Sequence, residues 1–114
     1  MLSPGPAKKV TIHVNRDTSA GEDYLSQEII SFLFGAGIAG ATVFYPAAGF
    51  GSHHRIHTDE GGSNTGQHMP VRIEFIEIAE KVAEVSPMLC ELLTDGLIEV
   101  QDTVILKAAS GTAR

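Results

Sequence analysis

The chain has 114 residues, of which 43% are hydrophobic and 19% are charged, and this composition is typical of one globular domain. Its net charge of −6 argues against non-specific nucleic-acid binding, which needs a basic surface. No apolar stretch reaches membrane-spanning length, so we expect no membrane insertion. The single cysteine, Cys90, cannot form an internal disulfide, and a cytoplasmic location is the simplest expectation.

Alternation and helical spacing predict a strand, a helix and a second strand in the first part of the chain. Residues 10–15 alternate as a strand, with His13 on the outward side. Ser19 and Glu22 have the spacing of a capping box, which predicts that a helix starts there. Apolar residues follow at helical spacing up to a stop near residues 35–37. The second strand covers residues 41–45.

A long polar segment, residues 47–69, separates this strand from the next one. Loops of this length are uncommon in compact domains and are usually functional or disordered. The third strand is centred on Val71, Ile73 and Phe75, and a helix with Pro87 inside its pattern follows. Because proline has no N–H to donate, we expect Pro87 to kink or split that helix.

The last predicted strand is interrupted near Asp102. The whole order, βαββαβ, predicts an α+β ferredoxin-like sandwich, with an antiparallel sheet, two helices on one face and a long loop between strands 2 and 3. We expect the domain to cover residues 8–107, between flexible tails at residues 1–7 and 108–114. The predicted core consists of Val10, Ile12, Val14, Leu25, Ile29, Phe32, Val43, Ile73, Phe75, Leu89 and Leu92.

Helices on one face leave the other face of the sheet to be covered. Phe44 and Ile76 point to that face by alternation and are apolar enough to favour a partner. These residues favour the association of this face with a partner.

The stretch GATVFYPAAGFGSHHRIHT, residues 40–58, is the most informative part of the sequence. Gly49 and Gly51 bracket Phe50, and two such glycines allow a sharp turn or a close approach of the backbone to a ligand. A basic, histidine-rich run follows. Its members can contact an anion or a metal, and they are His53, His54, Arg55 and His57.

The runs GATV, GFG and RIHT, followed by MPVRIEFIE and DGLIEV, resemble the PII-like proteins of the domain-of-unknown-function-190 family. The similarity covers residues 8–107. It implies a homotrimer that acts in signal transduction, binds a small anionic ligand of the nucleotide class between subunits, and presents residues 47–69 to a partner protein. An adenine nucleotide is the ligand to consider first. The ligand-binding residues that the resemblance implies are Gly49, Phe50, Gly51, Arg55 and His57.

Two features depart from true PII proteins. The stretch LLTDGLIEV, residues 92–100, has one glycine and no lysine, whereas PII proteins have a glycine-rich, lysine-bearing loop there that holds phosphates. A triphosphate site of the PII type is therefore not indicated. The tyrosine that some PII proteins modify in the loop also has no counterpart, since residues 47–69 contain no tyrosine.

The alternative is a trimer similar to the CutA proteins, with a divalent metal held by His53, His54, His57 and His68. No nucleophile or acid–base pair has a catalytic arrangement, so we do not expect an enzyme.

Overall fold

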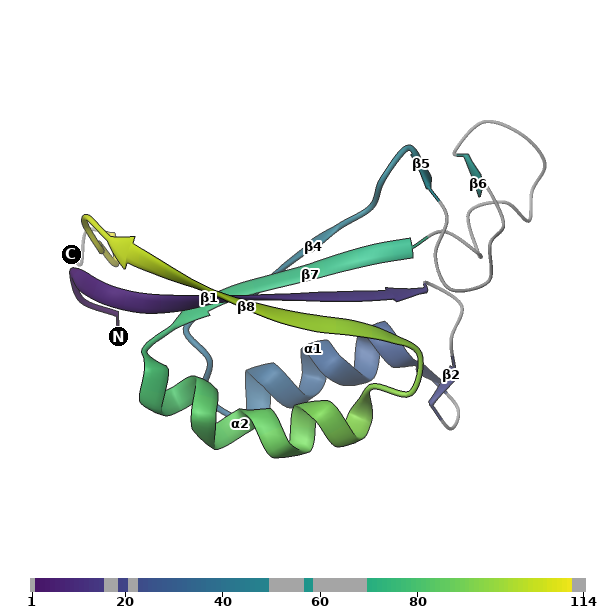
Figure 1. Cartoon of the computed structure of the whole chain (residues 1–114), viewed down its shortest axis with the longest axis horizontal. Coiled ribbons are helices and arrows are strands. Elements are labelled where there is room, and N and C mark those ends of the chain that lie inside the picture. The colour runs from purple at the N-terminus through teal and green to yellow at the C-terminus, as the bar shows by residue number, and fades with distance from the viewer. Residues whose placement is uncertain (1, 16–18, 21–22, 50–56, 59–69, 112–114) are drawn as a thin grey trace.

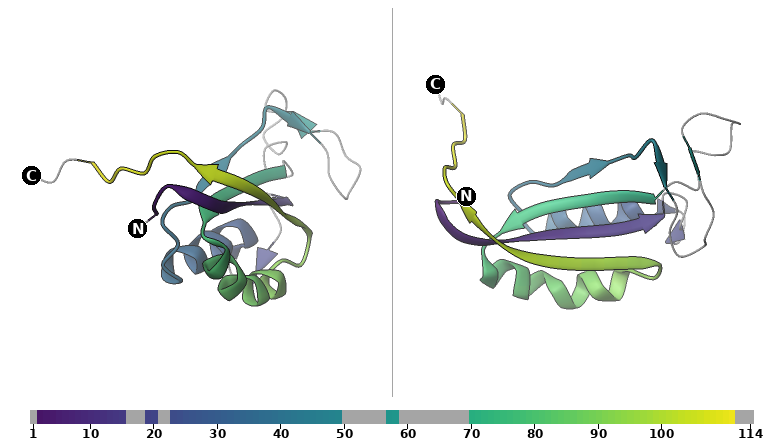
Figure 2. Two further views of the ribbon diagram at one scale, coloured as in Figure 1. Left: turned by 60° about the vertical axis from the view of Figure 1, so that its left-hand side comes forward. Right: turned by 45° about the horizontal axis from the view of Figure 1, so that its top comes forward.

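The computed structural model describes residues 2–15, 19–20, 23–49, 57–58 and 70–111. A four-stranded antiparallel sheet has the order β4-β7-β1-β8. Both helices, α1 (Leu25–Gly35) and α2 (Ala79–Leu92), lie on the same face of this sheet (Figures 1 and 2). The predicted α+β ferredoxin-like fold is confirmed. The strands of the sheet are β1 (Gly5–Asn15), β4 (Thr42–Phe44), β7 (Pro70–Glu77) and β8 (Gly96–Ile105).

Two short strand pairs lie outside the main sheet. The strand β2 (Ser19–Ala20) pairs with β3 (Asp23–Tyr24), directly before α1. The strand β5 (Ala48–Gly49) pairs with β6 (His57–Thr58). In Figure 1 this second pair lies beyond β4, at the end of the sheet where β1 ends and β7 begins.

The hydrophobic core lies between the sheet and the two helices. Eight of the predicted core residues are buried in it, and Phe32 and Val43 are partly buried against it. Leu92 is only half-buried and lies outside this cluster. Leu93 packs there instead, because the chain turns to an extended conformation at this residue, the C-cap of α2. The core also contains residues beyond the prediction, namely Leu33, Val71, Val82 and Val85.

Two predicted strand boundaries are wrong. The strand β1 begins at Gly5 rather than at residue 10, so it includes residues 5–7, which we expected to lie in a tail, and Ala7 is buried. The strand β8 runs without interruption through Asp102. Both strands are longer than predicted because they pair with each other over most of their length, and Lys8 forms an ion pair with Asp102 there.

The helix boundaries show one further error. The helix α1 begins at Leu25, and Ser19 lies in β2, so the expected capping box does not start the helix. Its predicted end is confirmed, since Gly37 has a φ of 83°, a conformation that favours glycine. The helix α2 is not split at Pro87. Near the proline, the Ser86 hydroxyl donates a 2.6 Å hydrogen bond to the Val82 carbonyl.

Candidate functional site

The structure brings together two residues of the predicted ligand site. Gly49 in β5 and His57 in β6 are direct partners in the antiparallel register, and Ala48 pairs with Thr58 beside them. This strand pair lies at the end of the sheet (Figure 1). The remaining predicted ligand and metal residues lie outside the described part of the chain, namely Phe50, Gly51, Arg55, His53, His54 and His68.

No helix lies on the second face of the sheet in the described structure (Figure 2), and we call this the open face. Neighbouring partners in a sheet point to the same side, and the alternate β1 residues Val10, Ile12 and Val14 point to the core. The register therefore places one row of side chains across the open face, consisting of Phe44, Arg72, His13 and Leu97. A second row beside it consists of Thr42, Glu74, Thr11 and Glu99.

Ion pairs connect these rows. The two carboxylate oxygens of Glu74 lie 3.7 Å from Lys9 Nζ and 3.1 Å from Arg72 Nε. His13 Nε2 lies 3.4 Å from Glu99 Oε2. Exposed ion pairs add little to stability. Their effect here is to fix the direction of the charged side chains on the open face.

Arg72 is held on two sides. Its guanidinium carbon lies 4.4 Å from the centre of the Phe44 ring, which is a cation–π contact, and its Nε faces Glu74. A pocket of about 730 Å³ opens beside this pair, at the end of the sheet where β5 starts. Its lining is mainly apolar and aromatic, with His13, Arg72 and Glu99 as the groups that can carry charge. The other lining residues are Phe44, Tyr45, Pro46, Ala48, Pro70, Val71 and Leu97.

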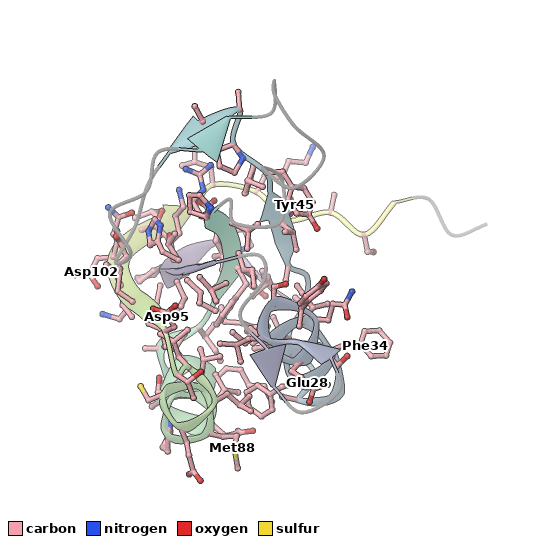
Figure 3. The ribbon with its side chains drawn as sticks, turned by 90° about the vertical axis from the view of Figure 1, so that its right-hand side faces the viewer. Glu28, Phe34, Tyr45, Met88, Asp95 and Asp102 are labelled. Carbon is pink, nitrogen blue, oxygen red and sulfur yellow. The ribbon has the colours of Figure 1, made fainter. Side chains whose placement is uncertain are left out.

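Tyr45 marks the β4 side of this region in Figure 3, far from Met88 on α2. Four of the residues that line the pocket form the row on the open face, across the sheet from the helices, namely Phe44, Arg72, His13 and Leu97. Because Ala48 both lines the pocket and belongs to β5, the pocket is continuous with the strand pair that holds Gly49 and His57. The site thus combines the oriented guanidinium of Arg72, the aromatic side chains of Phe44 and Tyr45, and Gly49 in the neighbouring strand pair.

Asp102 lies on β8, outside this pocket. The pKa of Asp102 is below its ordinary value because Lys8 donates a hydrogen bond to its carboxylate and adds a positive charge. Among the described residues, no group of three or more histidine, cysteine or acidic side chains is arranged to hold a metal. Neither described helix is long and apolar enough to cross a membrane.

Sequence reasoning found part of this site. The outward positions of His13 and Phe44 are confirmed. Arg72 was missed, although the alternation in VRIEFIE places it on the outward side of β7, where the burial pattern alternates. Its contact with Phe44 depends on the pairing of β4 with β7, which a single sequence does not show.

The fold and this site define a ferredoxin-like protein with an open sheet face that ends beside the β5–β6 strand pair. The chain belongs to the DUF190 family, described as "Uncharacterized ACR, COG1993", whose model matches residues 7–105. The resemblance that the sequence indicated is thus confirmed for almost the whole chain.

Solved structures show the same fold. The chain is similar to a PII-like signaling protein from Thermus thermophilus, with a TM-score of 0.65 and 18% identity over 92% of this chain and 94% of that chain. It is also similar to CPII, a nitrogen regulatory PII-like protein from Thiomonas intermedia, bound to ADP, AMP and bicarbonate. That match has a TM-score of 0.61 and 20% identity over 92% of each chain. The apo form of CPII matches with a TM-score of 0.58 and 18% identity, over 88% of this chain and 91% of that chain.

Proposed function

We propose that this protein is a PII-like regulatory protein that binds a small anionic, nucleotide-like ligand between its subunits. The observation that carries the proposal is the β5–β6 pair, which sets Gly49 opposite His57 beside the pocket on the open face. CPII, which has the same fold, is bound to ADP and AMP. An adenine nucleotide is therefore the first ligand to test.

The proposed contacts follow from the chemistry of the residues. Gly49 and Gly51, on either side of Phe50, allow backbone N–H groups to approach an anion closely. Arg55 offers a planar fork of donors for a phosphate or carboxylate. His57 adds a donor whose charge depends on pH.

We propose that the subunit assembles as a homotrimer through its open face. Leu97, Phe44 and Ile76 on this face are 52%, 39% and 36% exposed, respectively, and burial of apolar surface favours association. Light scattering should give three times the chain mass of 12.1 kDa. A monomer at micromolar concentration contradicts this assembly.

The 47–69 segment is the proposed contact for a partner protein. Segments that connect strands and change conformation with a ligand are a common means of regulation. We propose a binding protein rather than an enzyme, since neither the sequence nor the described site arranges groups for a reaction.

Calorimetry with ADP, AMP and ATP tests the ligand. Arg55→Ala should weaken nucleotide binding by about 1.5–3 kcal/mol, the usual cost of losing a charged hydrogen bond. Gly51→Val should also weaken binding, because a side chain there blocks a close backbone approach. Lys107→Ala, which removes an exposed cation outside the proposed site, is the control and should leave the affinity unchanged.

Zinc and copper titrations of the same protein test the metal-binding alternative. Metal binding that is lost in a His53→Ala/His54→Ala variant, together with no response to any nucleotide, would favour the CutA-like function instead. Unchanged nucleotide affinity in both Arg55→Ala and Gly51→Val would move the nucleotide site away from the loop base.

A further inference from the structure

We infer that residues 39–45, which we call the edge segment, separate from the sheet as a unit while the rest of the fold stays intact, and that Glu77 holds this segment closed. The edge segment contains β4 and leads into β5. The inference concerns the conformation of the subunit, so it does not depend on nucleotide binding.

The sheet holds the edge segment over a short length. The strand β4 has three residues, which pair with β7. By contrast, β7 pairs with β1 along all eight of its residues, and β8 pairs with β1 along all ten. Within β4, Thr42 and Phe44 are exposed and Val43 is partly buried against the core. Because β4 buries little apolar surface, its separation costs less free energy than unfolding of the whole sheet.

Glu77 fixes the beginning of the edge segment. Its side chain lies on the face of β7 that carries the buried residues, and it is only 7% exposed. Glu77 Oε2 accepts a 2.8 Å hydrogen bond from the N–H of Ala39, the first residue of the segment, and Oε1 accepts one from the Ile78 N–H at 3.3 Å. Water competes little with a partly buried hydrogen bond to a carboxylate. This contact therefore attaches the segment to the last residue of β7.

A second contact holds the segment near its other end. The Phe44 ring centre lies 4.4 Å from the guanidinium carbon of Arg72, and Glu74 Oε2 lies 3.1 Å from Arg72 Nε. This contact is on the open face, whereas Glu77 acts from the helix side of the sheet. The proposed association through the open face would cover Phe44, and a neighbouring copy bound there would favour the closed position. The inference is therefore compatible with the proposed assembly.

The chain before the edge segment is attached to α1. The N–H groups of Ala36, Gly37 and Ile38 donate hydrogen bonds of 2.9 to 3.2 Å to carbonyl groups in the last turns of this helix. Beyond Ile38 the chain has more space, since a Cβ atom added to Gly40 would meet no atom within 4 Å. Glycine also allows a wide range of backbone conformations. The hinge of the edge segment therefore lies directly after Ile38.

Separation of the edge segment would move the β5–β6 pair. Ala48, the first residue of β5, follows the end of the segment by three residues, and it pairs with Thr58 in β6. The pair lies at the end of the sheet where β7 begins, whereas Glu77 is the last residue of β7 (Figure 1). Glu77 would thus influence Gly49 and His57 from the opposite end of the sheet. This consequence rests on the proposed function, in which those two residues contact the ligand.

Native-state hydrogen exchange of the full-length protein, followed by NMR over a series of low urea concentrations, tests the inference. Protected amides in residues 39–44 should exchange at least about tenfold faster than those of Ile12 and Ile73 in the core strands. Their exchange should be nearly independent of urea, because a local opening exposes little surface. Exchange of the core amides should accelerate with urea, because it requires unfolding of the sheet.

Glu77→Gln tests the role of the carboxylate. The substitution keeps the size of the side chain but removes its charge, so the protected amides in residues 39–44 should exchange about tenfold faster than in the wild type. The amide signals of Ala48 and Gly49 should also shift. The matched control is Glu84→Gln, which changes an exposed carboxylate that pairs with Lys81 on α2 and should have neither effect. The urea dependence in the wild type tests the inference even if Glu77→Gln folds poorly.

Three results would overturn the inference. The first is the same exchange rate and urea dependence for residues 39–44 and for the core strands, because the sheet would then open as one unit. The second is unchanged exchange of residues 39–44 in Glu77→Gln. The third is an absence of shifts at residues 48–49 in that variant, which would separate the edge segment from the β5–β6 pair. A wild type that binds no nucleotide would instead contradict the proposed function, and it would leave these exchange results unaffected.

Discussion

The backbone N–H of Ala39 donates a 2.8 Å hydrogen bond to Oε2 of Glu77, a residue that is only 7% exposed. Ala39 lies in the connection from α1 to β4, and Glu77 is the last residue of β7. The other carboxylate oxygen of Glu77 accepts from the Ile78 N–H at 3.3 Å. The contact thus fixes the start of the short edge strand β4 to the junction between β7 and α2.

Replacement of Glu77 should release this connection. We expect Glu77→Ala to lower the free energy of unfolding by about 1–3 kcal/mol, because the Ala39 N–H loses a partly buried acceptor. Glu84→Ala removes an exposed carboxylate that pairs with Lys81 on α2, and it should change stability by less than about 0.5 kcal/mol. Urea unfolding measures both effects. Equal stability of the two variants would show that the Glu77 contact is not important for the fold.

Gly96 has no space for a side chain. A Cβ atom there would lie 1.9 Å from the His13 carbonyl oxygen, and the residue has a φ of 139°. We expect Gly96→Ala to destabilise the protein by about 2–4 kcal/mol, because both the backbone conformation and the approach of β8 to β1 would have to change. The melting temperature and the urea midpoint should both decrease.

Gly35 is the matched control for this substitution. It lies in α1, and nothing within 4 Å would contact an added Cβ. We expect Gly35→Ala to be neutral or to stabilise by up to about 1 kcal/mol, since alanine favours a helix more than glycine does. A destabilisation equal to that of Gly96→Ala would contradict the steric argument.

The ion pair between Lys8 and Asp102 should be visible in an acid titration. The pKa of Asp102 is lowered from 3.8, first by the hydrogen bond from Lys8 and then by its charge. A lowered folded-state pKa means that the stabilisation is present above the unfolded value and is lost as the pH falls through the folded value. We therefore expect the loss only below about pH 4. In Lys8→Met, NMR should show the carboxyl titrating closer to 3.8, and an unchanged midpoint would contradict this assignment.

Pro87 should be replaceable with a gain in stability. It lies inside the continuous helix α2 and is exposed, so it gives the helix no N–H at that position. We expect Pro87→Ala to stabilise the protein by about 1–2 kcal/mol, since alanine is the better helix former and the more flexible unfolded chain offsets part of the gain. Met88→Ala, at the exposed neighbouring position, should be nearly neutral. A loss of stability in Pro87→Ala would indicate that the proline itself makes a needed contact.

The sequence by itself determined the elements of the main sheet and both helices. In β1 and β7 every second side chain is apolar and buried. In the two helices the buried side chains, such as Leu25, Ile29 and Leu89, belong to apolar patterns with helical spacing. The sequence also indicated the family, and it identified residues 40–58 as the most informative stretch. These properties can be predicted from the sequence because each depends on residues that are close together in the chain.

Only the tertiary structure decided the strand ends and the candidate pocket. Residues 5–9 have no clear strand pattern of their own and become a strand because β8 pairs with them. Likewise, Arg72 and Phe44 are separated along the chain by the long segment and meet because β4 and β7 pair in one register. Hydrogen bonding between distant strands sets these contacts, and the local sequence does not encode which strand or which register will be the partner.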